Sequence, residues 1–127
     1  MKNFLITAAS ALLLMSFTVV VIGMNDIIAA LKQADPVELA KHLDSYVDIK
    51  LPNKDEVKNV SKNQAGITLK DFYSEQNITS FELSSQREMS GTGYLTGKLK
   101  SDSRSYNITV MVKTKGDTSY IVSVRIN

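Results

Sequence analysis

His42 is the residue best suited to acid–base chemistry, because it is the only histidine among the 127 residues. Glu38 lies four residues earlier, one turn away on a helix, so its carboxylate could orient the imidazole as a general base. The same spacing also describes an exposed pair that contributes only about 0.2–0.5 kcal/mol. Since the chain has no second histidine and no cysteine, the sequence favours this exposed pair over a His-based metal site or a Ser-His-Asp triad.

The complete absence of cysteine excludes several other chemistries. Thiolate nucleophiles, cysteine-ligated zinc and iron–sulfur clusters all need that residue. Gly91-Thr92-Gly93 is too short for a phosphate-binding loop, and a strand pattern follows it where such a loop needs a helix. The acidic residues do not have the spacing of a calcium loop. We therefore assign no catalytic residue, no cofactor-binding residue and no metal ligand from the sequence, and we expect no cofactor.

Basic and apolar residues on one side of the C-terminal strands indicate a different kind of site. Three apolar residues alternate out of phase with the expected core, among threonine and serine, and three basic residues share their side. Apolar groups on a polar sheet face often mark an interaction surface, although a solvated face is the simpler interpretation. The possible interaction face consists of Tyr94, Lys98, Met111, Lys113, Ile121 and Arg125. Through it we expect weak homodimerisation or contact with an anionic envelope glycan or lipid, and no nucleic acid.

Residues 1–23 differ sharply from the rest of the chain. Lys2 is their only charge, and residues 4–22 form an apolar run dominated by Ala, Leu, Val and Ile. A basic start, an apolar run and a small residue at Gly23 are typical of a secretory signal peptide. The run also approaches the ~20 residues that span a bilayer, so an uncleaved anchor is the alternative. Both interpretations predict that residues 24–127 are exported, to the periplasm or the extracellular space.

The composition of the exported part fits one domain. The whole chain is 43% hydrophobic and 22% charged with a formal net charge of +2, which excludes collagen-like and fully disordered chains. Residues 24–127 are enough to build a single hydrophobic core. Residues 94–127 carry six basic and two acidic side chains, a mild imbalance that could steer an anionic partner.

Helical and strand patterns alternate in the N-terminal half. Met24-Asn25-Asp26 begins one helix, and Asp35-Pro36 begins another, with Leu39, Ala40 and Leu43 as its buried stripe. Alternation over 46–51 predicts a strand, 52–55 a turn, and 57–60 a short return strand. Ser61-Lys62-Asn63-Gln64 is a capping box that opens a helix to about Glu75.

From Asn77 onward the hydrophobic period changes to two. The alternation predicts four consecutive strands joined by short turns, which form an antiparallel meander with one buried face. The core-facing positions are Phe81, Leu83, Leu95, Leu99, Ile108, Val110, Val112, Val122, Val124 and Ile126. Helices segregated from an antiparallel sheet define the α+β class.

This order of elements resembles the nuclear transport factor 2-like, or cystatin-like, cone, in which N-terminal helices pack on a curved antiparallel sheet around a pocket. More narrowly, residues 26 to 127 resemble a family of small exported bacterial proteins of unknown function. The motifs that carry the resemblance are Ser61-Lys62-Asn63-Gln64-Ala65, Leu69 with Phe72-Tyr73, Tyr94-Leu95-Thr96-Gly97-Lys98-Leu99, and Tyr106-Asn107-Ile108-Thr109-Val110. They specify a fold and imply no catalytic residues.

The resemblance raises one enzymatic alternative. Isomerases of the cone superfamily use a buried acid beside tyrosine donors, and Asp48 has Tyr46 and Tyr73 nearby in sequence. Asp48 alternates with Val47 and Ile49, however, so we expect it to face away from the core, where no burial would raise its pKa. We therefore predict a non-enzymatic binding module for an unknown small molecule or envelope component. A cofactor-free isomerase, dehydratase or hydrolase and a structural envelope component remain the alternatives.

Overall fold

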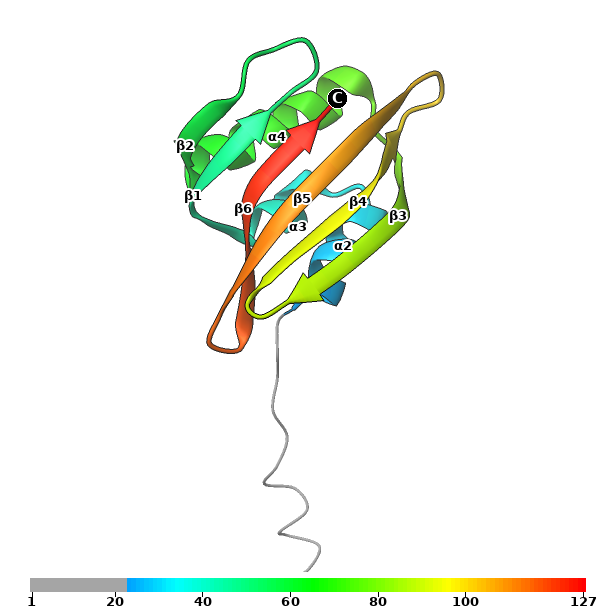
Figure 1. Cartoon of the computed structure of the whole chain (residues 1–127). Coiled ribbons are helices and arrows are strands. Elements are labelled where there is room, and N and C mark those ends of the chain that lie inside the picture. The colour runs from blue at the N-terminus through cyan, green and yellow to red at the C-terminus, as the bar shows by residue number, and fades with distance from the viewer. Residues whose placement is uncertain (1–22) are drawn as a thin grey trace, which may run out of the picture.

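A computed structural model describes residues 23–127, in which helices cover one side of a curved sheet (Figure 1). The α+β fold expected from the sequence is confirmed. The elements are α2 (Met24–Lys32), α3 (Pro36–Ala40), β1 (Leu43–Lys50), β2 (Val57–Ser61), α4 (Lys62–Gln76), β3 (Ser80–Met89), β4 (Thr92–Lys100), β5 (Ser105–Lys115) and β6 (Thr118–Ile126). The predicted membrane-directed segment, residues 4–22, lies outside the described residues. Within residues 23–127, no helix combines the length and the apolar character that crossing a membrane requires.

The two N-terminal helices begin where the sequence places them. The Asp35 carboxylate accepts hydrogen bonds from the backbone N–H groups of Val37 and Glu38, both at 3.1 Å, and Pro36 occupies the first turn. Helix α3 is nevertheless shorter than expected, because it ends at Ala40 and Leu43 already belongs to β1. Leu43 is still buried, but it reaches the core from a strand.

Helix α4 also follows its sequence signals. The Ser61 hydroxyl accepts a hydrogen bond from the Gln64 N–H at 3.3 Å, which caps the first turn. The helix ends at Asn77, whose φ of 52° is the left-handed conformation that asparagine tolerates at a C-terminus. Between these caps the apolar side chains are buried against the sheet and the other helices: Ala65, Leu69, Phe72 and Tyr73.

The six strands form one sheet in the order β2-β1-β6-β5-β4-β3. Four neighbouring pairs are antiparallel, and the meander from β3 to β6 is the one that the alternating pattern predicts. The exception is β1, which pairs with β6 in parallel. A hairpin turn forces antiparallel pairing, whereas strands this far apart in sequence can meet in either direction.

Strand β6 contains an irregularity that reverses the expected direction of one side chain. The pairing of β5 with β6 shifts between Met111, which faces Ser123, and Val112, which faces Ile121. Val122 is thus an extra residue, the geometry of a β-bulge. Before the bulge, the inward position belongs to Ile121, which is fully buried, and Val122 is half-buried. The prediction that Ile121 faces outward and Val122 inward is wrong.

Beyond the bulge the alternation is as predicted. The core-facing residues of β4 and β5 are buried, as are Val124 and Ile126 in β6. Together with α2, α3 and α4 they form one continuous core, which leaves the opposite side of the sheet uncovered by the three helices (Figure 1).

Candidate functional site

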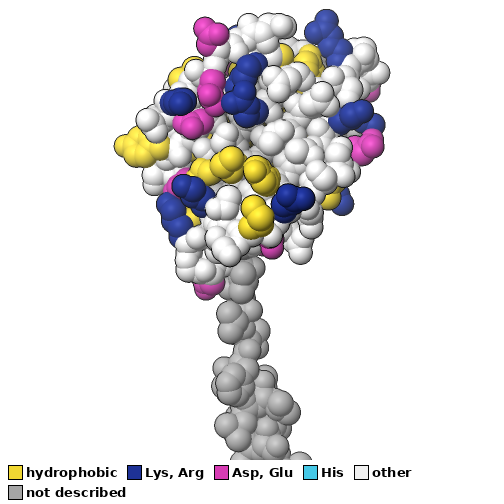
Figure 2. Space-filling model, viewed as in Figure 1, with side chains coloured by type: hydrophobic (Ala, Val, Ile, Leu, Met, Phe, Trp, Pro, Cys, Tyr) yellow, Lys and Arg dark blue, Asp and Glu magenta, His cyan; other side chains and the backbone are white. Residues whose placement is uncertain are grey.

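We use the term outer face for the side of the sheet that points away from the helices. A row of side chains crosses it from strand to strand, because Arg87 pairs with Tyr94, Tyr94 with Met111, Met111 with Ser123, and Ser123 with Asp48. Tyr94 is 40% exposed and Met111 is half-buried. Figure 2 shows hydrophobic side chains near the centre of this face, with lysine and arginine side chains around them.

Two lysines lie at opposite ends of the outer face. Lys113 pairs across the strands with Thr92, and Lys98 lies six residues further along β4, opposite Asn107. At about 3.4 Å per residue, their backbone positions are about 20 Å apart along the strands. Both lysines are exposed, and within the described residues neither forms an ion pair, although Glu82, which is paired with Lys100, lies across the strands from Lys98.

Hydroxyl groups occupy the space between the two lysines. Thr96 pairs with Thr109 across β4 and β5, and Ser85 pairs with Thr96 from the β3 side. The Ser85 and Thr96 hydroxyls lie 2.7 Å apart and are hydrogen-bonded. The outer face thus combines cations at its ends with hydroxyls and a Tyr–Met pair between them.

Two other cations of this region are held by carboxylates. Arg125 donates to Glu56 Oε1 at 3.0 Å, and Lys115 donates to Asp44 Oδ2 at 2.8 Å. The ammonium group of Lys115 holds the pKa of the Asp44 carboxyl below its usual range. Arg125 therefore lies on the outer face, as the sequence predicted, across the β5–β6 pairing from Thr109, with its charge already compensated.

One expected member of the outer face is absent from it, and two others were missed. Ile121 lies in the core because of the bulge, and half-buried Tyr120 and Val122 take the outward positions beside it. The Lys115 ammonium lies 5.6 Å from the centre of the Tyr120 ring, in cation–π contact. The signal in the sequence was the unbroken apolar run Tyr120-Ile121-Val122, which no strict alternation can accommodate.

The proposed pair of Glu38 and His42 does not form. Helix α3 ends before His42, which lies in the turn that leads into β1. The Glu38 carboxylate instead accepts a hydrogen bond from Lys41 Nζ at 2.9 Å. His42 contributes through its backbone, since its carbonyl accepts the Ile121 N–H at 2.8 Å.

Replacing His42 by alanine should change the free energy of unfolding by less than about 0.5 kcal/mol, as for surface positions in general. The backbone bond to Ile121 does not depend on the side chain, and alanine can retain it. Urea denaturation of both chains measures the difference. A loss well above 1 kcal/mol would mean that the imidazole takes part in the packing of this turn.

The acid and the tyrosines of the enzymatic alternative lie apart. Asp48 is on the outer face, and its Oδ1 accepts the Asn59 N–H at 3.0 Å. Tyr46 is 64% exposed, whereas Tyr73 is buried in the core on α4. Burial raises the pKa of the Tyr73 hydroxyl, which has no hydrogen-bond partner among the described residues. The sheet separates Asp48 from Tyr73, so the two do not form an acid–donor pair.

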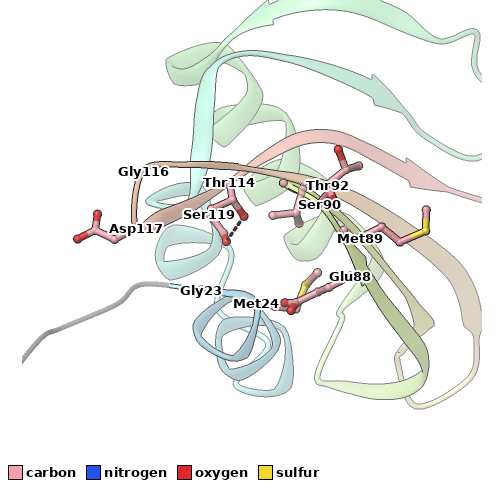
Figure 3. A pocket seen from close by; sticks show the side chains of 13 residues that line it. Gly23, Met24, Glu88, Met89, Ser90, Thr92, Thr114, Gly116, Asp117 and Ser119 are labelled. Atoms are coloured by element: carbon pink, nitrogen blue, oxygen red, sulfur yellow. Dashed lines mark hydrogen bonds between the residues drawn. The ribbon is translucent and has the colours of Figure 1, made fainter.

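A cleft of about 410 Å³ lies at one end of the sheet, between the tips of the β3–β4 and β5–β6 hairpins and the start of α2. Figure 3 shows Thr114 and Ser119 hydrogen-bonded to each other within the β5–β6 hairpin, at 3.1 Å, and the Asp117 side chain turned away. Glu88 is then the carboxylate left beside the cleft. The polar groups that line the cleft do not converge on a point where a reacting atom could sit.

Residues 23–127 contain no group of three histidine, cysteine or acidic side chains placed to share a metal ion. In this part of the chain, neither the Glu38–His42 pair nor the Asp48–Tyr73 pair is assembled. The outer face is the candidate functional site, because it presents an aromatic group and charged groups that are neither buried in the core nor held in ion pairs.

Comparisons with known proteins agree with the fold. The family model described as "Domain of unknown function (DUF4783)" matches residues 24–127. Crystal structures of DUF4783 family proteins superpose well. The Bacteroides uniformis protein is 24% identical, with a TM-score of 0.74 over 82% of this chain and 94% of that one. The Bacteroides ovatus protein is 20% identical, with a TM-score of 0.73 over 80% and 90%.

More distant structures extend the likeness to the cone fold. A protein of Cytophaga hutchinsonii described as an "NTF2-like protein of unknown function" is 10% identical, with a TM-score of 0.55 over 80% of this chain and 82% of that one. No curated protein matches the chain. The resemblance to a nuclear transport factor 2-like family of unknown function is confirmed.

Proposed function

Because the chain belongs to DUF4783, a family of domains of unknown function, its role has to be inferred from its own surface, and we propose that it is an exported, non-enzymatic binding module. Its outer face would hold an anionic glycan of the cell envelope. The observation that carries this proposal is the separation of Lys98 and Lys113, about 20 Å along the strands, with neither lysine in an ion pair within the described residues.

A flat face with separated cations suits an extended polymer better than a small molecule. Small-molecule sites are concave and enclose most of the ligand surface. On the outer face, an acidic sugar chain lying along β4 and β5 would reach both lysines and meet the hydroxyls of Thr96 and Thr109 between them. Tyr94 and Met111, two residues further along the same strands towards Lys113, offer an apolar surface for the sugar rings.

Export is part of the proposal and rests on the sequence. Lys2 followed by the apolar run of residues 4–22 is typical of a signal peptide or an N-terminal anchor. An exported chain meets envelope polymers and rarely meets nucleic acid, which is why we propose a glycan as the polyanion.

We expect the chain to bind polygalacturonate, a linear polymer of acidic sugars, and not the neutral polymer dextran. Exposed ion pairs contribute about 0.2–1 kcal/mol each, so the double substitution Lys98→Gln with Lys113→Gln should weaken binding by up to about thirtyfold. Isothermal titration at low salt measures the affinity, which should fall as salt is added.

The matched control is Lys54→Gln with Lys58→Gln, which removes the same charge from exposed positions in and beside β2. This control should retain the wild-type affinity. If both double variants lost affinity equally, binding would depend on net charge alone and the outer face would not be the site. Equal binding to dextran and polygalacturonate would also contradict the proposal.

The second candidate partner of the outer face is another copy of the chain. Tyr94 is 40% exposed beside Met111, so the outer face presents an apolar group among its hydroxyls and charges. Two outer faces packed together would also bring their lysines close, so we propose that any homodimer is weak and becomes stronger as salt screens the repulsion. Sedimentation velocity at rising salt distinguishes this from glycan binding, which salt weakens.

A further inference from the structure

A second surface lies between helices α3 and α4, away from the outer face of the sheet. The two helices pack closely and leave a groove of about 380 Å³ along their line of contact. Its floor consists of small residues, since a Cβ built on Gly66 would lie 3.3 Å from the Ala40 Cβ. Val37 and Ile67 stand beside the floor, 55% and 50% exposed, although both are large aliphatic residues.

The rim of this groove is positively charged. Three lysines line it, namely Lys41, Lys62 and Lys70, and no acidic residue does. Lys41 is paired with Glu38 at 2.9 Å, so the uncompensated charge rests on the other two. Lys62 Nζ donates only a long bond, 3.4 Å, to the Lys41 carbonyl. Within the described residues, neither Lys62 nor Lys70 forms an ion pair.

We propose that this groove docks on the surface of an anionic phospholipid membrane. Exposed aliphatic side chains surrounded by lysines match such a surface, because the aliphatic groups enter the acyl boundary while the ammonium groups stay among the phosphates. Val37 and Ile67 are the inserting groups, and Lys62 and Lys70 contact the headgroups. This inference concerns a different surface from the proposed glycan site and does not depend on it.

An acidic protein partner fits the same groove less well. Arginine is enriched among the residues that dominate protein interfaces, and no arginine lines the groove. Lysine presents a point charge and lacks the fork of arginine that pairs with a carboxylate through two bonds. The residue types therefore favour lipid headgroups.

The chain contains no tryptophan, so a single introduced one reports its own surroundings. We would replace Ile67 by tryptophan in the full chain and add vesicles of phosphatidylcholine, with or without phosphatidylglycerol. Any membrane association of the N-terminal segment is common to all variants, whereas tryptophan at position 67 responds to the groove. The expected result is a blue-shifted emission that depends on phosphatidylglycerol and is quenched by brominated acyl chains.

The matched probe is Met89→Trp, at a residue on β3 that is 58% exposed and does not line the groove. Its emission should not change. A juxtamembrane lysine contributes about fivefold to binding of an anionic surface, so Lys62→Gln with Lys70→Gln should weaken docking of the Ile67→Trp chain by roughly thirtyfold. Lys54→Gln with Lys58→Gln, which removes the same charge elsewhere, should leave docking unchanged.

Three results would overturn the proposal. The first is an Ile67→Trp emission that phosphatidylglycerol leaves unchanged, and the second is an equal shift at position 89. The third is a shift produced by soluble poly-glutamate but not by the vesicles, which would assign the groove to an acidic protein. Because the glycan titration uses Lys98 and Lys113, either proposal can fail without the other.

Discussion

Replacing Ile121 by lysine should unfold the domain. Ile121 has no exposed surface and lies in the core before the bulge of β6. The substitution removes a buried aliphatic side chain, which alone costs about 2–5 kcal/mol, and it forces an ammonium group into an apolar environment at a further cost of several kcal/mol. The total approaches the whole stability of a typical domain, about 5–15 kcal/mol.

Met111→Lys is the matched control for Ile121→Lys. Met111 precedes Val112, the partner of Ile121 in the β5–β6 pairing, but its own side chain lies on the outer face, where it pairs with Tyr94 and Ser123. Its lysine variant should keep the near-ultraviolet circular dichroism and amide dispersion of the wild type and lose at most about 1 kcal/mol in urea. If both lysine variants stayed folded, Ile121 would face outward and the β6 register would be shifted by one residue.

Gly97→Ala should destabilise the domain by about 2–3 kcal/mol. Gly97 is buried in the middle of β4, between β3 and β5. A Cβ at this position would lie 2.4 Å from the Glu82 carbonyl oxygen and 2.5 Å from the Phe81 ring. The carbonyl belongs to the backbone of the paired strand, so relief requires β3 to move and its hydrogen bonds to weaken. The entropy that alanine removes from the unfolded chain, about 0.4–1 kcal/mol, does not offset this.

Gly66→Ala is the control for that effect, because it is the same substitution in a helix. Its nearest contact would be the Ala40 Cβ at 3.3 Å, a side-chain atom of a short helix that can adjust slightly. Helix propensity favours alanine over glycine by about 1 kcal/mol. Urea denaturation should therefore find this variant close to wild type. If the Gly97→Ala variant were also close to wild type in its free energy of unfolding, the Phe81 ring and the β3 backbone would have moved to make room for the new methyl group.

Local signals in the sequence were sufficient for most of the fold. Asp35 before Pro36 and Ser61 before Gln64 fixed the starts of two helices, because a cap needs only the backbone next to it. The alternation around Leu95 and Ile108 fixed the buried face of the meander. These features depend on neighbours within a few residues, so they can be read from one chain without its partners.

The candidate site was predictable only in part. Tyr94, Lys98, Met111, Lys113 and Arg125 lie on the outer face as the alternation requires. The sequence could not show that Arg125 is paired with Glu56, since the two are 69 residues apart and meet through the packing of the β1–β2 connection beside β6. The sequence also predicted that His42 lies on the same helix as Glu38. The helix ends before His42, and Glu38 forms its ion pair with Lys41.

The sequence by itself determined the elements, their buried faces and the absence of cysteine chemistry, because periodicity and residue type are local properties. The tertiary structure decided the parallel pairing of β1 with β6 and the bulge that exchanges Ile121 with Val122. In the run Tyr120-Ile121-Val122, either phase of a strand buries an aliphatic residue, so the pattern has two solutions of similar hydrophobic energy. Two contacts select one of them: the Ile121 N–H donates to the His42 carbonyl in the turn before β1, and Ile121 pairs with Val112 of β5. These contacts exist only once distant parts of the chain have come together.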